Sequence, residues 1–151
     1  MGHFASGVTI VTVVRDGVRH AMTATAVCSV SLEPPLILVC VSKASRFHAA
    51  ITNADAWAIS LLAAGQETVA RHFANRGRDL LTQFEVVPHG VAPHSRAPLI
   101  DGALAWLDCA TFATHDGGDH TIVVGRVEHV DIAPEPFEPL LFYRAAFGRF
   151  Q

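Results

Sequence analysis

The sequence predicts a mainly β protein, an antiparallel barrel that is closed or nearly closed and carries a few short helices. Three observations lead to this fold class. Apolar and β-branched runs of strand length recur along the chain, few segments show helical spacing, and long alternating strand–helix units are absent. The last observation argues against a Rossmann fold, and the sequence contains neither a GxGxxG nor a GxxxxGK[ST] motif.

Length and composition indicate one domain, residues 1–151, in which half of the residues are hydrophobic. A chain of this size can bury a sizeable core without disulfides or metal ions. The formal net charge of −3 gives no reason to expect nucleic acid or a membrane surface as a partner. No apolar run reaches the roughly 18 residues of a membrane span, so we expect no membrane association.

The start of the chain and its cysteines bear on where the protein works. Residues 1–4 lack the charged and apolar regions of a signal peptide. Cys28, Cys40 and Cys109 are isolated and odd in number, which predicts reduced thiols in a cytoplasmic protein. A core-like segment begins almost at once, at residue 7, so we expect the natural chain to start before Met1 with a leading helix.

The first elements form a predicted hairpin. Residues 8–14 are β-branched throughout, and Asp16-Gly17 is a dipeptide that two-residue type I′ turns prefer. Residues 18–25 return as the second strand. Residues 27–32 continue extended until the prolines that follow Glu33 stop them. The next apolar run, residues 36–41, is of strand length and reads as a strand buried on both faces.

Two helices follow among further strands. Ser45 is a fitting N-cap for a helix over residues 45–52, with Phe47, Ala50 and Ile51 on one face. Residues 66–75 predict a second helix with Val69, Ala70 and Phe73 inward, ending near Gly77.

Three further strands are expected at residues 56–62, 103–115 and 121–132, and a turn at residues 116–119 connects the last two. Residues 88–98 are expected to form a surface loop.

The run of residues 22–35 is the most informative for function. Thr23, Thr25, Ser29 and Ser31 are small hydroxyl residues in an otherwise apolar stretch. Small side chains let a flat ligand approach the backbone, whose N–H groups and hydroxyls can then bind the edge of that ligand. The alternative is a strand with its hydroxyl side chains on the solvent face.

A second candidate is the start of the first helix. Ser42, Lys43, Ser45 and Arg46 surround a helix start whose free N–H groups attract phosphate, and two of them add positive charge. The alternative is an ordinary capped helix with solvated basic residues.

His120 is the third candidate, because it begins a strand directly after the turn and can project into a ligand cleft. The alternative is a histidine that only satisfies a local partner.

Other chemistries find little support. The nine histidines show no HExxH motif, no CxxC accompanies them, and we expect no metal site. No GxSxG motif indicates a serine hydrolase. The basic cluster of Arg71, Arg76 and Arg78 is typical of a solvated face, although one arginine could reach a phosphate.

Taken together, these segments resemble the flavin reductase family, the reductase components of two-component flavin monooxygenases. The resemblance runs from Phe4 to about Phe147, and its order and spacing are more specific than any single piece. The matching pieces are residues 4–12, residues 22–24 through 29–36, Ser45 with His48, Leu61 with Gln66 and Phe73-Ala74, Gly118-Asp119-His120 with Gly125, and Pro139-Leu140 with Tyr143-Arg144.

The resemblance implies a six-stranded antiparallel Greek-key split barrel with two or three short helices, and a homodimer with flavin sites near its interface. It implies that Thr23, Ala24 and Thr25 line the flavin ring, and that Ser29 and Ser31 face the ribityl–phosphate part. It further places Ser42, Lys43 and Ser45 near the phosphate, Phe73 and Ala74 beside the flavin, His120 as the catalytic residue at the nicotinamide side, and Tyr143 and Arg144 as contributions from the tail.

The implied activity is hydride transfer from NADH or NADPH to FMN or FAD, which supplies reduced flavin to a separate monooxygenase. Three rivals remain: a non-catalytic flavin-binding module, an oxidase of pyridoxine phosphate on a related barrel, and a structural dimer without ligand. The oxidase would need more basic residues along the strands than the sequence offers.

Overall fold

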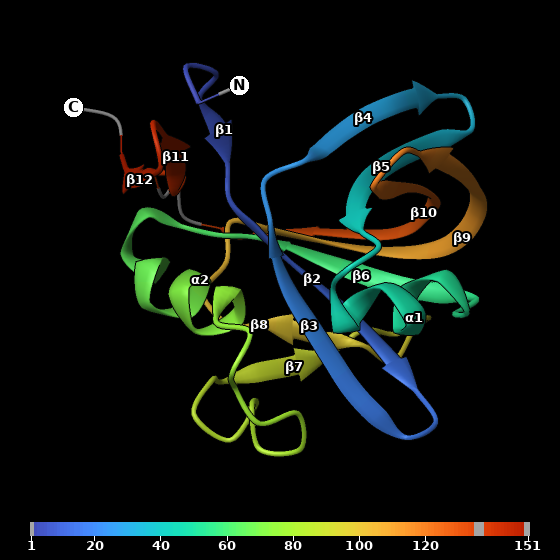
Figure 1. Ribbon diagram of the computed structural model, residues 1–151, viewed down its shortest axis with the longest axis horizontal. Helices are drawn as coiled ribbons and strands as arrows, with labels where there is room; N and C mark the ends of the chain where they lie inside the picture. Colours follow the sequence, from blue (N-terminus) through green and yellow to red (C-terminus); the bar gives the residue numbers. More distant parts are fainter. Residues whose placement is uncertain (1, 135–137, 150–151) are drawn as a thin grey trace.

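The protein is described by a computed structural model that covers residues 2–134 and 138–149; residues 1, 135–137 and 150–151 of the expected domain lie outside the described residues. Within that part, the main sheet has seven antiparallel strands: β2 (Thr9–Arg15), β3 (Val18–Ala24), β4 (Val27–Leu32), β5 (Pro35–Ser42), β6 (Ala56–Leu61), β9 (Ala105–Gly117) and β10 (His120–Ile132). Their order is β3-β2-β6-β9-β10-β5-β4 (Figure 1). The mainly β prediction is therefore confirmed.

The sheet is strongly curved, but β3 and β4, which end the strand order, share no ladder in the described residues. The sheet is thus not closed, and it has seven strands where six were expected. The extra strand has a local cause, because β3 and β4 form one extended course that bends at Thr25 and Ala26 (Figure 1). The two parts pair with different strands, β3 with β2 and β4 with β5, so one extended course counts as two strands.

Both predicted hairpins form. Asp16 and Gly17 connect β2 to β3 with φ of 51° and 75°, the two positive values that a type I′ turn requires. The turn between β9 and β10 is shorter than expected, because Gly117 already pairs with His120. Gly118, with φ of 75°, and Asp119 alone make this turn. His120 is therefore the first residue of β10.

The two helices agree closely with the sequence. α1 (Arg46–Thr52) is capped by Ser45, whose Oγ accepts a hydrogen bond from the His48 N–H at 3.2 Å. Its buried residues are the predicted ones, Phe47, Ala50 and Ile51. α2 (Glu67–Ala74) follows a short 3₁₀ turn, η1 (Ala64–Gln66), and buries Ala70 and Phe73. Both helices pack against β2 and β3.

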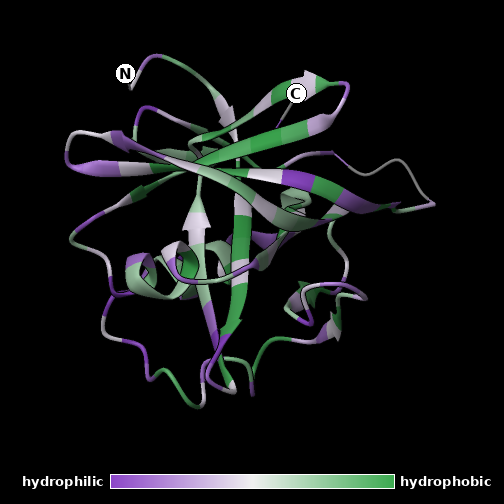
Figure 2. Ribbon diagram, turned by 90° about the vertical axis from the view of Figure 1, so that its right-hand side faces the viewer, coloured by the Kyte–Doolittle hydropathy of each residue, from purple (hydrophilic) through white to green (hydrophobic). Residues whose placement is uncertain are grey.

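The core lies between the curved sheet and this helical layer. Hydrophobic residues follow the strands, whereas the peripheral loops are largely hydrophilic (Figure 2). Trp57 of β6 is fully buried, and its ring lies under Gly125 of β10. A Cβ atom at Gly125 would stand 2.6 Å from Trp57 Cζ2, so this close approach requires glycine. In β5, only Val39 and Val41 are fully buried. The expectation that this strand is buried on both faces is therefore wrong for the chain described here.

The segment of residues 88–98, predicted as a surface loop, is largely exposed but is more ordered than its composition predicted. It forms a small hairpin, β7 (His89–Val91) and β8 (Pro98–Ile100). The buried carboxylate of Asp108 accepts hydrogen bonds from the backbone N–H groups of His94, at 2.6 Å, and Ser95, at 3.1 Å. The Asp108 carboxylate thus binds backbone N–H groups of this segment for which the polar sequence indicated contact with solvent.

The ends of the described chain form a separate three-stranded sheet of β1 (Ser6–Gly7), β11 (Leu141–Tyr143) and β12 (Ala146–Gly148). None of the helices in the described residues is long and apolar enough to cross a membrane.

Candidate functional site

A cavity of about 390 Å³, here called the inner cavity, lies between β3, the start of α1 and the end of α2. The segments that surround it come from distant parts of the sequence and are held together by the sheet (Figure 1). Its lining residues are Ala21, Met22, Thr23, Ser42, Ala44, Ser45, Arg46, Phe47, Phe73, Ala74, Arg76 and Arg78.

Five of the predicted cofactor-binding residues are brought together on the inner cavity: Thr23, Ser42, Ser45, Phe73 and Ala74. Two of their hydroxyls are already engaged. Thr23 Oγ1 donates to the Ala70 carbonyl at 2.6 Å, and Ser45 Oγ caps α1. These two side chains therefore fix the walls of the cavity.

Ala24 and Thr25 do not line this cavity. Ala24 is buried in the main core, against which Met22 also packs. Thr25, at the bend, lines a separate and largely apolar cavity of about 460 Å³ with residues of β1 and β6. The bend thus lies between two cavities, which the alternation of small residues in the sequence could not reveal.

Ser29 and Ser31 stand on β4 and line none of the cavities described here. Ser29 is exposed and Ser31 is half-buried. The described residues therefore do not bring these two hydroxyls to the inner cavity.

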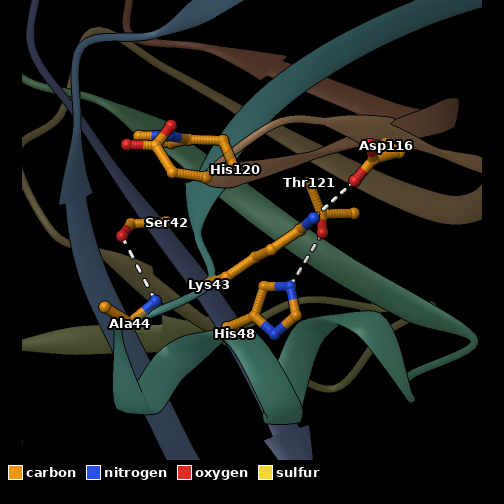
Figure 3. A network of polar contacts seen from close by, with 8 residues as sticks. Ser42, Lys43, Ala44, His48, Asp116, His120 and Thr121 are labelled. Atoms are coloured by element: carbon orange, nitrogen blue, oxygen red, sulfur yellow. Dashed lines mark hydrogen bonds and ion pairs between the residues drawn. The ribbon is translucent and has the colours of Figure 1, made fainter.

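Lys43 also lies outside the inner cavity, although both of its neighbours line it. Its ammonium group pairs with the carboxylate of Asp116 on β9, and its backbone N–H donates to the Asp119 carbonyl at 2.9 Å. The ion pair lowers the pKa of Asp116 below its ordinary value. Lys43 therefore ties the turn between β9 and β10 to the end of β5 (Figure 3).

His120 does not line the inner cavity itself but stands beside the lining residue Ser42, at a position here called the rim. It pairs with Ser42 across the ladder of β10 and β5, and the two residues lie near each other in Figure 3. Its Nδ1 lies 2.7 Å from Asp119 Oδ1, a contact that lowers the pKa of the Asp119 carboxyl. Its Nε2 atom makes no hydrogen bond to the residues that the structure describes and can meet a ligand.

Tyr143 and Arg144 are not brought to the inner cavity. Tyr143 belongs to β11 and stacks edge-on against His3, with ring centroids 6.2 Å apart. The backbone N–H of Arg144 donates to the Gly2 carbonyl at 2.8 Å. Both residues serve the separate sheet of the chain ends in the described structure.

The sequence underrated Arg76 and Arg78, whereas Arg46 was already a candidate at the start of the first helix. Arg46, Arg76 and Arg78 all line the inner cavity and give it a positive wall. Of the three clustered arginines that read as a solvated face, Arg71 and Arg76 are exposed, and Arg71 pairs with Glu67 at 2.6 Å, whereas Arg78 is half-buried.

The guanidinium of Arg78 is held by several neighbouring groups. Its guanidinium donates to the carbonyls of Ala21 and Asn75 and to Gln83 Oε1, and it lies 5.5 Å from the centroid of the Phe73 ring. Burial, with a contribution from the charge of Arg46, lowers the pKa of Arg78 to about 10. The group stays charged at neutral pH and fixes the loop that follows α2.

Metal chemistry gains no support from the described residues, which contain no group of three or more His, Cys, Asp or Glu side chains placed to hold an ion. The three cysteines are free thiols. Burial raises the pKa of the Cys109 thiol to about 12, so this cysteine is no nucleophile at neutral pH.

Known proteins resemble this chain over nearly its whole length. An NADH-dependent FAD reductase of Streptomyces globisporus is 45% identical over 150 residues, which cover 99% of this chain and 81% of that protein. The reductase component of 4-hydroxyphenylacetate 3-monooxygenase from Thermus thermophilus is 39% identical, over 99% of this chain and 91% of that protein. These relatives are flavin reductases or reductase components of two-component monooxygenases.

Solved structures agree. The NADH:FAD oxidoreductase of Streptomyces globisporus, in complex with NAD and FAD fragments, superposes with a TM-score of 0.93 at 44% identity, covering 99% of this chain and 88% of that one. The flavin reductase component of a bacterial two-component tryptophan halogenase gives 0.92 at 41% identity, covering 98% and 92%. The family described as the flavin reductase like domain matches residues 1–151. The chain therefore belongs to the flavin reductase family, as the resemblance of its sequence predicted.

Proposed function

We propose that this protein transfers hydride from NADH to FMN or FAD and supplies the reduced flavin to a separate monooxygenase. The observation that carries the proposal is the inner cavity, which joins an aromatic and small-residue surface to three arginines. A flavin nucleotide has the matching character, a flat ring at one end and phosphate at the other. The NADH-dependent relatives support NADH as the donor.

The residues of the cavity match the chemistry of such a ligand. Met22 and Phe73 offer apolar surface for a ring, and β3 offers backbone N–H groups at its edge beside the bend. Arg46 and Arg76 can neutralise phosphate, and Ser42 adds a hydroxyl. We assign Thr23, Ala24 and Thr25 to the ring through their backbone, and Ser42, Lys43 and Ser45 to the phosphate side.

The nicotinamide and flavin rings supply the redox chemistry when both are bound. The chain contributes orientation, because the donor and acceptor atoms must lie about 3–3.5 Å apart. His120, at the rim, is placed to hold the nicotinamide side through Nε2 while Asp119 fixes its Nδ1. No residue of the inner cavity is needed as a general base.

We further propose a homodimer. Leu32 is 89% exposed and Val30 is 48% exposed, and both lie on β4, which has one unpaired edge in the described sheet. A second copy on this edge would cover them and bring Ser29 and Ser31 near an interface. The same arrangement is the route by which Tyr143 and Arg144 would reach a flavin.

The strand order, in which β6 follows β5 in sequence but lies beside β2, supports the Greek-key connection. The free thiols support a cytoplasmic location.

The test is NADH oxidation followed at 340 nm with the purified chain, with and without FMN or FAD. Oxidation that depends on added flavin is expected, and Arg76→Gln should raise the KM for flavin with little change in kcat. Flavin binding without turnover would instead favour the non-catalytic module. Turnover of pyridoxine phosphate would favour the oxidase, and a chain that binds neither ligand would be the structural dimer.

A further inference from the structure

Gln83 is a polar side chain that the fold buries in the loop after α2, where it is only 2% exposed. Burying an amide costs free energy unless its polar groups find partners. Those of Gln83 all do. Its Nε2 donates to the carbonyls of Arg19, at 2.8 Å, and Leu80, at 3.0 Å, and its Oε1 accepts a hydrogen bond from Arg78 Nε at 2.8 Å. Both ends of the amide are therefore engaged.

The two carbonyls determine which way this amide faces. A carbonyl oxygen can only accept a hydrogen bond, so the NH₂ end of Gln83 must face Arg19 and Leu80. Turning the amide over would place its oxygen against both carbonyls and its NH₂ group against the N–H of Arg78. The oxygen of Gln83 consequently faces Arg78, and the backbone sets the orientation of the group that holds the guanidinium.

Arg78 carries this order to the inner cavity. It lines the cavity, whereas Gln83 does not. Three of its N–H groups are held, by Gln83 Oε1 and by the carbonyls of Asn75 and Ala21. A guanidinium has five N–H donors, so the remaining two can meet an anion in the cavity. Among the three acceptors, only that of Gln83 belongs to a side chain, so only this one can be removed by substitution.

The other two arginines of the cavity differ from Arg78 in their freedom. Arg46 and Arg76 are exposed, and each must lose side-chain freedom to hold a ligand. Arg78 is half-buried and already held in one orientation, so it loses less. Because burial and then the charge of Arg46 lower its pKa, an anion beside Arg78 would favour its charged form. Arg78 is thus the preorganised cation of the three.

We propose that Gln83 is a positioning residue of the flavin site, which acts through Arg78 and turns its guanidinium toward the phosphate of a flavin nucleotide. The inference rests on the proposed function for the identity of the ligand. The alternative is that Gln83 only stabilises the loop after α2, in which case its loss weakens every ligand of the cavity alike. The two roles differ in their dependence on phosphate, which FMN carries and riboflavin lacks.

The experiment uses Gln83→Met, which keeps the length of the side chain and removes the amide. Gln66→Met is the matched control. The amide of Gln66 also bonds the backbone, at the Asp101 carbonyl and the Ala63 N–H, and it does not line the inner cavity. Fluorescence titrations with FMN and with riboflavin give two affinities for each protein. Both substitutions are also made in an Arg78→Lys background, and denaturant unfolding shows that each chain is folded.

The expected result is a loss that is selective for phosphate. Gln83→Met should weaken FMN binding about tenfold and leave riboflavin within about twofold, whereas Gln66→Met should match the wild type for both. In the Arg78→Lys background, Gln83→Met should change FMN binding less than about twofold, because the guanidinium that it orients is gone. If Gln83→Met does not fold, Gln83→Glu takes its place. Its carboxylate would pair with Arg78 and weaken FMN binding with the same selectivity.

Three results would overturn the inference: equal losses for FMN and riboflavin, an unchanged affinity for FMN, or an undiminished effect of Gln83→Met in the Arg78→Lys background. A selective loss of FMN in a chain that does not oxidise NADH would overturn only the proposed function. A wild-type chain that binds neither flavin would overturn both.

Discussion

His48 and Thr121 are joined by a hydrogen bond of 2.8 Å between the imidazole Nε2 and the threonine Oγ1. His48 belongs to α1, and Thr121 follows His120 in β10, so the bond links the helix beside the inner cavity to the strand that carries the rim histidine (Figure 3). It acts in parallel with the ion pair of Lys43 and Asp116. The link makes His48 and Thr121 positioning residues for His120.

Thr121→Val should loosen this link while keeping the shape of the side chain. We expect kcat/KM for NADH to fall about tenfold, mainly through KM, because small displacements of an orienting group reduce reactive geometry. Thr121→Ser should restore the value, since it keeps the hydroxyl. Steady-state kinetics at saturating flavin check the prediction, and a serine variant as impaired as the valine variant would contradict it.

Arg78→Lys is expected to damage the inner cavity although it keeps the charge. Lysine cannot reach the carbonyl of Ala21, the carbonyl of Asn75 and Gln83 Oε1 together, because it lacks the planar fork of the guanidinium. Buried acceptors left without a donor cost about 1–3 kcal/mol. Denaturant unfolding should show the loss in the free energy of unfolding, and Arg71→Lys, on the exposed side of α2, is the control with little effect.

Gly125→Ala should destabilise the protein by about 1–3 kcal/mol, because its Cβ would collide with Trp57 and with Cys109 Cβ, 2.9 Å away. Gly90→Ala adds the same atom where nothing stands within 4 Å. Thermal unfolding of the two variants separates the collision from the general effect of losing a glycine. A melting temperature for Gly125→Ala equal to that of Gly90→Ala would refute the close packing of this site.

The thiols should differ in reactivity and in their effect on stability. The pKa of Cys109 is about 12 in the folded chain against an ordinary value of 9.0, so its contribution to stability is complete below pH 9 and is lost as pH rises from 9 towards 12. Unfolding free energies measured at pH 8 and pH 10.5 should show this decrease.

At pH 8 a thiol reagent should modify the exposed Cys28 readily and Cys109 only after unfolding. Equal rates for both cysteines would show that Cys109 is not buried.

Local features of this fold could be predicted from the sequence wherever neighbours in the chain decide them. Asp16-Gly17 determines its turn through its own backbone, and Ser45 caps α1 through an N–H only three residues away. The spacing of the buried residues in α1, three and four positions apart, follows from helical geometry. Such contacts need no knowledge of the distant chain.

The site depended on contacts that the sequence does not record. Arg78 reads as a solvated cation, yet its partner at Ala21 belongs to a strand from the first part of the chain. Asp108 offered a signal that could have been used, since a lone carboxylate in an apolar strand needs a donor, and it finds two in the hairpin of β7 and β8. Thr23 and Thr25 looked equivalent until the bend placed them on different cavities.

The pairing of Ser42 with His120 has a consequence for how the protein matures. The hairpins of β2 with β3 and of β9 with β10 need only short loops to close, whereas β5 must find β10 from the other half of the chain. The rim and wall of the inner cavity meet only at that long-range contact. A nascent or partly folded chain therefore has no nucleotide site, and the first appearance of ligand affinity during refolding marks the completion of the sheet.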